Sequence, residues 1–143
     1  MAAILISIYG YESQTRFAAG AHITFPLDGS HVDRNTIAEG KATGARYGHT
    51  VWLLIEGADN RYYPQAHVAP PNSPWKKNVF FGSKDAVGWV FTLLAVECDK
   101  SASERFDHYL TSQTDSFHQD APINPLEVSS QIKVLEKVVV IRS

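Results

Sequence analysis

The sequence predicts a mostly β domain, of the kind in which strands form a sandwich or a barrel. Three observations support this class. Proline, glycine and asparagine divide the chain at short intervals, the segments between them are short, and those segments are rich in aromatic and β-branched residues. A length of 143 residues and a hydrophobic fraction of 44% fit a single domain with one core.

Eight segments are predicted to be strands, because each is a short run of apolar, aromatic or β-branched residues bounded by turn residues. In chain order they are residues 3–9, 22–25, 35–43, 50–56, 61–63, 75–81, 88–97 and 133–142. The strand at 61–63 is predicted to stop at Pro64.

One helix is predicted, over residues 101–112. Ser101 and Glu104 have the spacing of a capping box, and apolar residues then recur at helical spacing. This helix is expected to cover one end or edge of a sheet. The residues that follow, 113–131, show no clear periodicity and are predicted to form a long loop, which is a candidate for function because such loops are uncommon inside compact domains.

Two of the predicted strands are apolar on both faces. In residues 50–55 and 87–98 the alternation expected of a strand with one wet face is largely lost. A second layer must therefore cover the outer face of these strands. The predicted helix and the N-terminal strand are expected to cover part of it, and another subunit or a different protein would cover the rest.

Composition and charge argue against nucleic acid as a partner. Thirteen Lys+Arg and fifteen Asp+Glu give a net charge of -2, and no run of basic residues could neutralise a series of phosphates. The single cysteine, Cys98, lies in an apolar run and is predicted to be buried and inert. The apolar residues 1–9 lack the positive flank of a signal peptide and are far too few for a membrane span, so we expect them to be retained. A cytoplasmic location is favoured over secretion.

No pattern in the chain predicts a metal, a cofactor or catalysis. The six histidines have no ligand spacing and no cysteine pair beside them. The chain contains no Gly-x-Ser-x-Gly elbow and no glycine-rich loop with a lysine for phosphates. We therefore expect a protein that is not an enzyme. A small hydrolase in which Cys98 pairs with His108 or His118 is kept as an alternative, because such partners meet in space and not in sequence.

A series of short motifs resembles a known domain family. In chain order the motifs are Ile23-Thr-Phe-Pro26-Leu-Asp-Gly29, Val32, Ala38-Glu-Gly40-Lys-Ala, Val51-Trp52-Leu-Leu, Arg61-Tyr-Tyr-Pro-Gln65, Trp75, Phe80-Phe-Gly82 and Gly88-Trp-Val-Phe91. Together they resemble a bacterial immunoglobulin-like accessory domain, over roughly residues 22–142. The element from Arg61 to Gln65 is the most specific of them.

The resemblance implies an immunoglobulin-like antiparallel β-sandwich over residues 22–143, with residues 1–21 as an apolar strand or arm outside it. It also implies a core tryptophan on the third strand, Trp52, and we expect Trp89 and Phe91 in the core as well. The closing run, Val138-Val-Val-Ile-Arg142, resembles the last strand of such domains and indicates a complete module.

The predicted function is that of a non-catalytic protein-interaction or assembly module, an accessory subunit of a larger bacterial complex. Its partner is expected to be another protein or a second copy of the chain, bound through a sheet edge or an apolar sheet face. Outward tyrosine and arginine make good anchors for another surface. The predicted contact residues are Arg61, Tyr62, Gln65, Trp75, Ile4, Ile6 and Ile8.

The alternative function is that of a carbohydrate-binding module. In this interpretation Trp75 and Tyr62 stack on a sugar and Arg61 forms hydrogen bonds to it. Trp75 follows a proline-rich segment, residues 70–74, which is rigid enough to hold an indole at an exposed corner. The competing interpretation of Trp75 places its ring over the end of the sandwich, where it would be a core residue.

Overall fold

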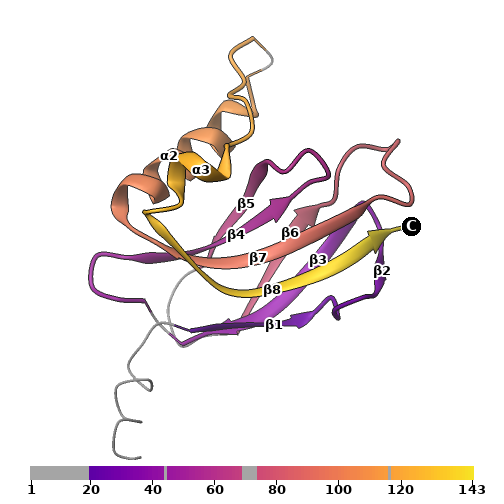
Figure 1. Ribbon diagram of the computed structural model, residues 1–143, viewed down its shortest axis with the longest axis horizontal. Coiled ribbons are helices and arrows are strands. Elements are labelled where there is room, and N and C mark those ends of the chain that lie inside the picture. The colour runs from indigo at the N-terminus through magenta and orange to yellow at the C-terminus, as the bar shows by residue number, and fades with distance from the viewer. Residues whose placement is uncertain (1–19, 44, 69–73, 116) are drawn as a thin grey trace, which may run out of the picture.

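The computed structural model describes residues 20–43, 45–68, 74–115 and 117–143. Within these ranges the chain forms two β-sheets and two helices, so the mostly β class is confirmed (Figure 1). Neither helix is long and apolar enough to cross a membrane. The strand predicted at residues 3–9 lies outside the described residues.

The smaller sheet has three antiparallel strands in the order β1-β3-β6. They are β1 (Ala21–Phe25), β3 (Asn35–Ala42) and β6 (Pro74–Phe80). Exposed and buried residues largely alternate along β3, so one face of the sheet points to the core. The indole of Trp75 lies over Gly40 on the neighbouring strand, where a Cβ would come within 2.3 Å of the ring. Only glycine leaves room for this packing.

The larger sheet has five strands in the order β2-β8-β7-β4-β5. The strands are β2 (His31–Val32), β4 (Thr50–Glu56), β5 (Tyr62–Val68), β7 (Val90–Cys98) and β8 (Ile132–Arg142). β2 pairs with β8 in parallel, and the other neighbours pair in antiparallel fashion. The short β2 was not predicted, because two residues carry no periodic pattern.

The main core lies between the two sheets. Leu53, Leu93 and Phe91 of the larger sheet pack there with Ala38 and Val79 of the smaller one, and all five are buried. Removing such apolar surface from water contributes about 25 cal/mol per Å², which makes this layer the main source of stability.

A second apolar cluster lies on the outer face of the larger sheet, beneath the helices α2 (Lys100–Ser112) and α3 (Pro125–Val128) (Figure 1). The strands β4 and β7 contribute Trp52, Leu54, Leu94, Val96 and Cys98, and the helices contribute Ala102, Phe106, Tyr109 and Val128. Ile123, which forms an isolated β-bridge with Tyr62, also belongs to the cluster. The prediction that a helix covers the second face of these strands is confirmed.

Two strand boundaries, the end of β5 and the start of β7, differ from the prediction by more than one residue. β5 continues through Pro64 to Val68, although the predicted strand stopped at this proline. Proline is tolerated there because β5 is an edge strand whose pairing with β4 has an irregularity beside Pro64. β7 begins at Val90 and not at Gly88, because the preceding residues form a turn in which the Trp89 N–H donates to the Ala86 carbonyl at 3.0 Å.

The helix α2 ends at Ser112 as predicted, but it begins one residue earlier, at Lys100, and has a different N-cap. The carboxylate of Asp99 accepts the N–H of Ala102 at 2.9 Å, so Asp99 is the cap and the prediction of Ser101 was wrong.

The segment 113–131, predicted to be a loop, contains α3. Asn124 caps this helix by accepting the N–H of Leu126 at 3.0 Å, and Pro125 occupies its first turn. A helix of four residues is too short for apolar periodicity to reveal it.

Candidate functional site

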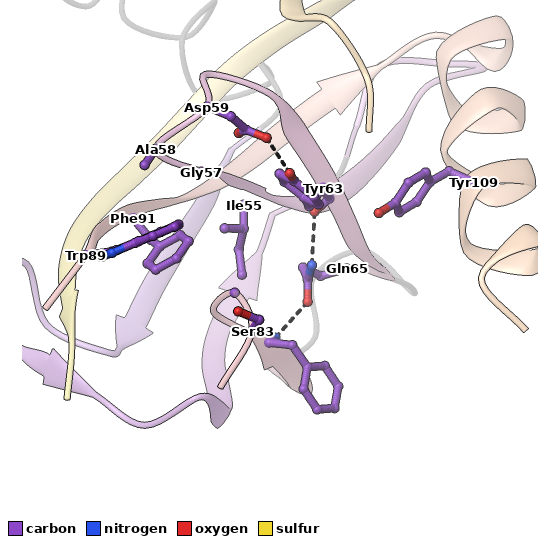
Figure 2. Close-up of a pocket in the computed structure, with 12 residues that line it drawn as sticks. Ile55, Gly57, Ala58, Asp59, Tyr63, Gln65, Ser83, Trp89, Phe91 and Tyr109 are labelled. Atoms are coloured by element: carbon purple, nitrogen blue, oxygen red, sulfur yellow. Dashed lines mark hydrogen bonds between the residues drawn. The ribbon is translucent and has the colours of Figure 1, made fainter. Parts of the chain in front are cut away.

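A cleft of about 600 Å³ opens beside the edge strands β5 and β6, where the two sheets meet (Figure 2). Its volume is in the range of sites that bind small molecules or side chains. The lining residues come from segments that are far apart in the sequence: Ile55, Gly57, Ala58, Asp59, Tyr63, Gln65, Phe80, Gly82, Ser83, Trp89, Phe91 and Tyr109. We call this the aromatic cleft.

Two large aromatic side chains at the aromatic cleft are open to solvent. Trp89 is 53% exposed and Phe80 is 50% exposed. The prediction that Trp89 is a core residue was wrong, because this residue lies in the turn before β7 and not within the strand. Phe91, two residues further on, is buried as predicted and packs against Phe81 with ring centroids 6.0 Å apart.

Asp59 and Tyr63 form the main polar pair of the aromatic cleft. The Tyr63 hydroxyl donates a hydrogen bond to one carboxylate oxygen of Asp59, and the other oxygen accepts the N–H of Arg61 at 3.1 Å (Figure 2). Burial, together with the hydrogen bond to Asp59, raises the pKa of Tyr63 to about 12. The hydroxyl therefore stays protonated and the carboxylate keeps its donor.

The side chain of Gln65 lies between Tyr63 and Phe80. Its nitrogen donates to the Tyr63 carbonyl at 3.1 Å, and its oxygen accepts the Phe80 N–H at 2.8 Å. Both ends of the amide are thus used within the fold.

The buried side chain of Arg142 holds the loop that follows β6. The guanidinium of Arg142 donates to the carbonyls of Phe81 at 2.7 Å, Ser83 at 2.6 Å and Lys84 at 3.3 Å. Gly82, which lines the cleft, has a φ of +75°, and a Cβ there would lie 2.7 Å from the Phe91 ring. Arg142 and Gly82 together fix the loop against the cleft wall.

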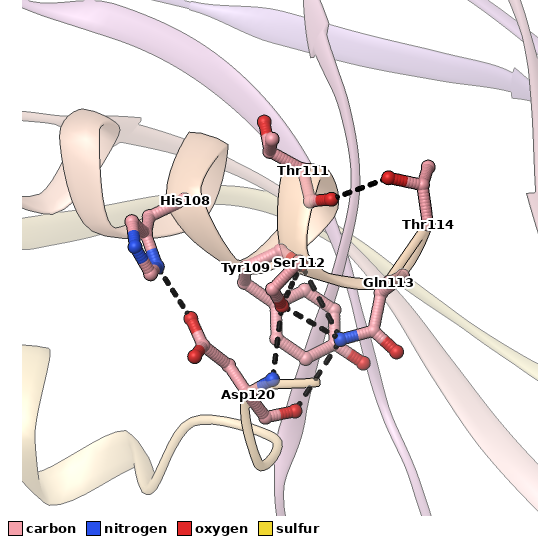
Figure 3. A network of polar contacts seen from close by, with 7 residues as sticks. All are labelled: His108, Tyr109, Thr111, Ser112, Gln113, Thr114 and Asp120. Carbon is pink, nitrogen blue, oxygen red and sulfur yellow. Dashed lines mark hydrogen bonds and ion pairs between the residues drawn. The ribbon is translucent and has the colours of Figure 1, made fainter. Parts of the chain in front are cut away.

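Tyr109, a residue of the helix α2, lines the aromatic cleft. A polar network at the end of α2 holds this region: Ser112 Oγ donates to the Tyr109 carbonyl at 2.7 Å and accepts the Asp120 N–H at 2.9 Å (Figure 3). His108 contacts the Asp120 carboxylate at 2.6 Å in the same network. Burial, then the nearby Asp120 and Asp59, raises the pKa of Tyr109.

A second, more polar cleft of about 330 Å³ adjoins the first across Tyr109. Arg61, Arg105 and Glu127 line it, and Arg105 pairs with Glu127. The Asp120 carboxylate there is engaged by His108. Because most of its charges are paired with one another, this cleft is a weaker candidate than the aromatic cleft.

The predicted contact residues have different surroundings. Arg61 is exposed, Tyr62 is half-buried against the outer cluster, and Gln65 lines the aromatic cleft. Trp75 is only 5% exposed, so the expectation that it offers an outward indole was wrong; its ring fills the space over Gly40.

The other predicted contact residues, Ile4, Ile6 and Ile8, lie outside the described residues. Trp52 is 2% exposed, as expected of a core residue. It packs beneath α2 and not between the sheets, with its ring 5.6 Å from that of Phe106.

Cys98 lies in the outer cluster and is buried. Burial raises the pKa of its thiol to about 11, and its hydrogen-bond partner is Thr50 at 3.5 Å. His108 and His118 are instead engaged by the carboxylates of Asp120 and Asp115. This is not the environment of an activated thiolate. Among the described residues no three His, Cys, Asp or Glu side chains are grouped to hold a metal ion.

Sequence reasoning missed Asp59, Tyr63, Phe80 and Tyr109 as members of one site. The spacing of Asp59 and Tyr63 on either side of a turn was the only local signal. The other aromatic residues come from β6, β7 and α2, which meet only in the folded chain.

Comparisons of the chain with protein-family models, with curated proteins and with solved structures return no match. The structure itself therefore defines the class, a mostly β protein of two sheets with a helix-covered outer face. Its most distinctive surface feature is the aromatic cleft at the β5 and β6 edges.

Proposed function

We propose that this chain is an immunoglobulin-like binding module that acts without catalysis and contacts a partner protein through the aromatic cleft. The observation that carries the proposal is the exposure of about half of the surface of Trp89 and of Phe80 at one cleft. Large aromatic side chains supply most of the energy at protein interfaces, and grouped exposed ones mark such surfaces.

The strand order supports the immunoglobulin-like assignment. In such domains one sheet holds the first, second, fourth and fifth strands, and the other holds the third, sixth and seventh. The sheet β1-β3-β6 matches the first, second and fifth strands, and β4, β7 and β8 match the other sheet; β5 departs from the pattern, because it pairs with β4 at the edge of the larger sheet. The position of Trp52 departs from the pattern, because its ring lies under α2.

The use of polar groups supports a binding role. The amide of Gln65 and the hydroxyl of Tyr63 already serve the fold, so they are not available as a general acid or base. The one thiol, Cys98, lies buried under the helix layer with a raised pKa. What remains exposed at the cleft includes aromatic surface and the carboxylate of Asp59.

Site-specific photo-crosslinking in cells tests the proposal. A benzophenone amino acid is introduced at Phe80, and the matched control carries it at Tyr47, which is fully exposed and does not line the cleft. We expect one protein to be captured from position 80 and not from position 47. The purified captured protein should bind the purified chain and lose affinity for Trp89→Ala.

Equal capture from both positions, or unchanged affinity of Trp89→Ala, would overturn this assignment of the surface. A glycan array provides the contrasting result: binding to a sugar that depends on Trp89, with no protein captured, would support the carbohydrate-binding alternative instead.

A further inference from the structure

We infer that the aromatic cleft receives a positively charged side chain, lysine or arginine, from an extended segment of the partner. The inference rests on the proposed function and names the chemistry of its ligand. Among the lining residues Asp59 is the only one that carries a charge, and none is lysine, arginine or histidine. The other large lining side chains are the rings of Tyr63, Phe80, Trp89, Phe91 and Tyr109.

Rings and a carboxylate around one space favour a cation. The face of an aromatic ring attracts a cationic group, and tryptophan does so most strongly. Figure 2 shows Asp59, Trp89 and Tyr63 around the same opening, with the Tyr63 hydroxyl directed to Asp59. Trp89 is about half-exposed, so a group that enters from solvent can reach this residue.

The hydrogen bonds already made inside the cleft leave acceptors for a ligand. The Tyr63 hydroxyl donates to Asp59, and the amide of Gln65 is used at both ends. The carboxylate of Asp59 accepts two hydrogen bonds from the fold, from Tyr63 and from the Arg61 N–H, and a carboxylate has about four acceptor positions. A ligand that donates therefore fits, and a charged donor forms the stronger bond.

A sugar fits this arrangement less well. Its neutral hydroxyl groups would form hydrogen bonds to the Asp59 carboxylate but no ion pair with it.

The surroundings of the cleft indicate that the cation belongs to a protein segment and not to a free amine. Val87 and Val90 flank Trp89 in the sequence, and both are largely exposed. They add exposed apolar surface next to Trp89 in the chain. Residues on either side of the basic side chain would cover this surface.

Selection of peptides on the immobilised chain tests the inference. A display library of random heptapeptides is panned, and binders are kept only if Trp89→Ala abolishes binding. Binding is followed by tryptophan fluorescence, since Trp52 and Trp75 are buried and Trp89 is half-exposed. We expect the kept peptides to share a lysine or arginine, and norleucine in its place to weaken binding about tenfold or more.

Asp59→Asn should weaken binding of the same peptides about tenfold, because the neutral amide loses the ion pair. Asp85→Asn is the matched control, since it makes the same change of net charge in the nearby turn, at an exposed carboxylate that does not line the cleft. Thermal melts verify that both variants fold.

The two proposals can fail separately. Peptides that need Trp89 but show no basic preference, or equal affinities of Asp59→Asn and Asp85→Asn, would overturn the cation inference and leave the binding module intact. If no peptide needs Trp89, the inference and the proposed protein-binding surface both fail.

Discussion

The side chain of Gln65 on β5 accepts the main-chain N–H of Phe80 on β6 at 2.8 Å, and so connects the edge strands of the two sheets. Elsewhere between the sheets the carboxylate of Glu136 on β8 accepts the N–H of Ile23 on β1 at 2.6 Å. An edge strand with free main-chain donors invites pairing with another chain. In each of these two contacts a side-chain oxygen accepts the main-chain N–H of an edge strand, so that this N–H is no longer free.

Gln65→Ala should destabilise the fold by about 0.5–1.5 kcal/mol, because the hydrogen bond to Phe80 is lost where water can partly replace it. Urea unfolding measures the change. Gln119→Ala is the control, since the amide of Gln119 makes one exposed contact in a loop. Equal stabilities of the two variants would mean that the bridge between β5 and β6 has no energetic role.

Trp52→Ala should cost about 3–5 kcal/mol, because it leaves a cavity under α2 and removes the contact with Phe106. Ser103→Ala should cost about 1–3 kcal/mol, since the buried indole N–H now donates to Ser103 Oγ at 2.9 Å. Thermal and urea melts give both values. A Trp52→Ala variant as stable as the parent would contradict its place in the outer cluster.

Cys98 should react slowly with a thiol reagent in the folded protein and rapidly after denaturation. Burial raises its pKa to about 11, so the reactive thiolate is scarce at neutral pH as well as hidden. The test is the time course of labelling with and without urea. Fast labelling of the native protein would restore the hydrolase alternative.

Glu97 should make stability depend on pH in the acid range. Burial alone would raise the pKa of this carboxyl, but hydrogen bonds from the main chain and guanidinium of Arg46 outweigh burial and lower it below 4.5. A lowered folded-state pKa stabilises the fold above about pH 4.5, and this contribution is lost as the pH falls through the folded-state value.

Glu97→Gln should therefore be less stable than the parent at neutral pH, and the difference should shrink below pH 4.5. Urea melts across this range measure it. Glu104→Gln, at an exposed helix position, is the control and should show little change at any pH. A constant difference between Glu97→Gln and the parent would show that Glu97 contributes by packing and not by charge.

Arg142→Lys should destabilise the fold by about 1–3 kcal/mol, because one ammonium group cannot reach the three carbonyls that the guanidinium now contacts. The exposed Arg34, which donates to the nearby Gly82 carbonyl, gives the control Arg34→Lys. Differential scanning calorimetry compares the two. If both melt alike, Arg142 does not support the loop at the cleft.

Most strands could be predicted because their cause is local. Runs such as residues 50–56 are mostly apolar, contain β-branched and aromatic residues, and lie between turn residues, and β4 has these bounds. The helix α2 was found by its apolar spacing. Its cap was not, because Asp99 and Ser101 are both residue types that cap helices and lie only two positions apart, and only the path of the chain decides between them.

The aromatic cleft could not be predicted because it depends on turn geometry and on contacts between distant segments. Trp89 follows Gly88, whose φ of +84° ends the turn and places the indole outside the strand. A hydrophobic run starting at Val87 gives no sign of this. Trp75 was misplaced for the opposite reason, since the space that buries it is made by the missing side chain of Gly40 on another strand.

The chain leaves β7 at Asp99 and returns to β8 at Gln131, where the N–H of Asp99 donates to the Gln131 carbonyl at 3.1 Å. The segment between Asp99 and Gln131, which contains both helices, thus starts and ends at neighbouring positions, like an insertion in a hairpin. Closing a flexible loop costs only about 0.6 kcal/mol more for each doubling of its length. This segment can therefore be replaced in evolution by one of another length without shifting the register of β7 and β8. The replacement must still cover the apolar outer face of β4.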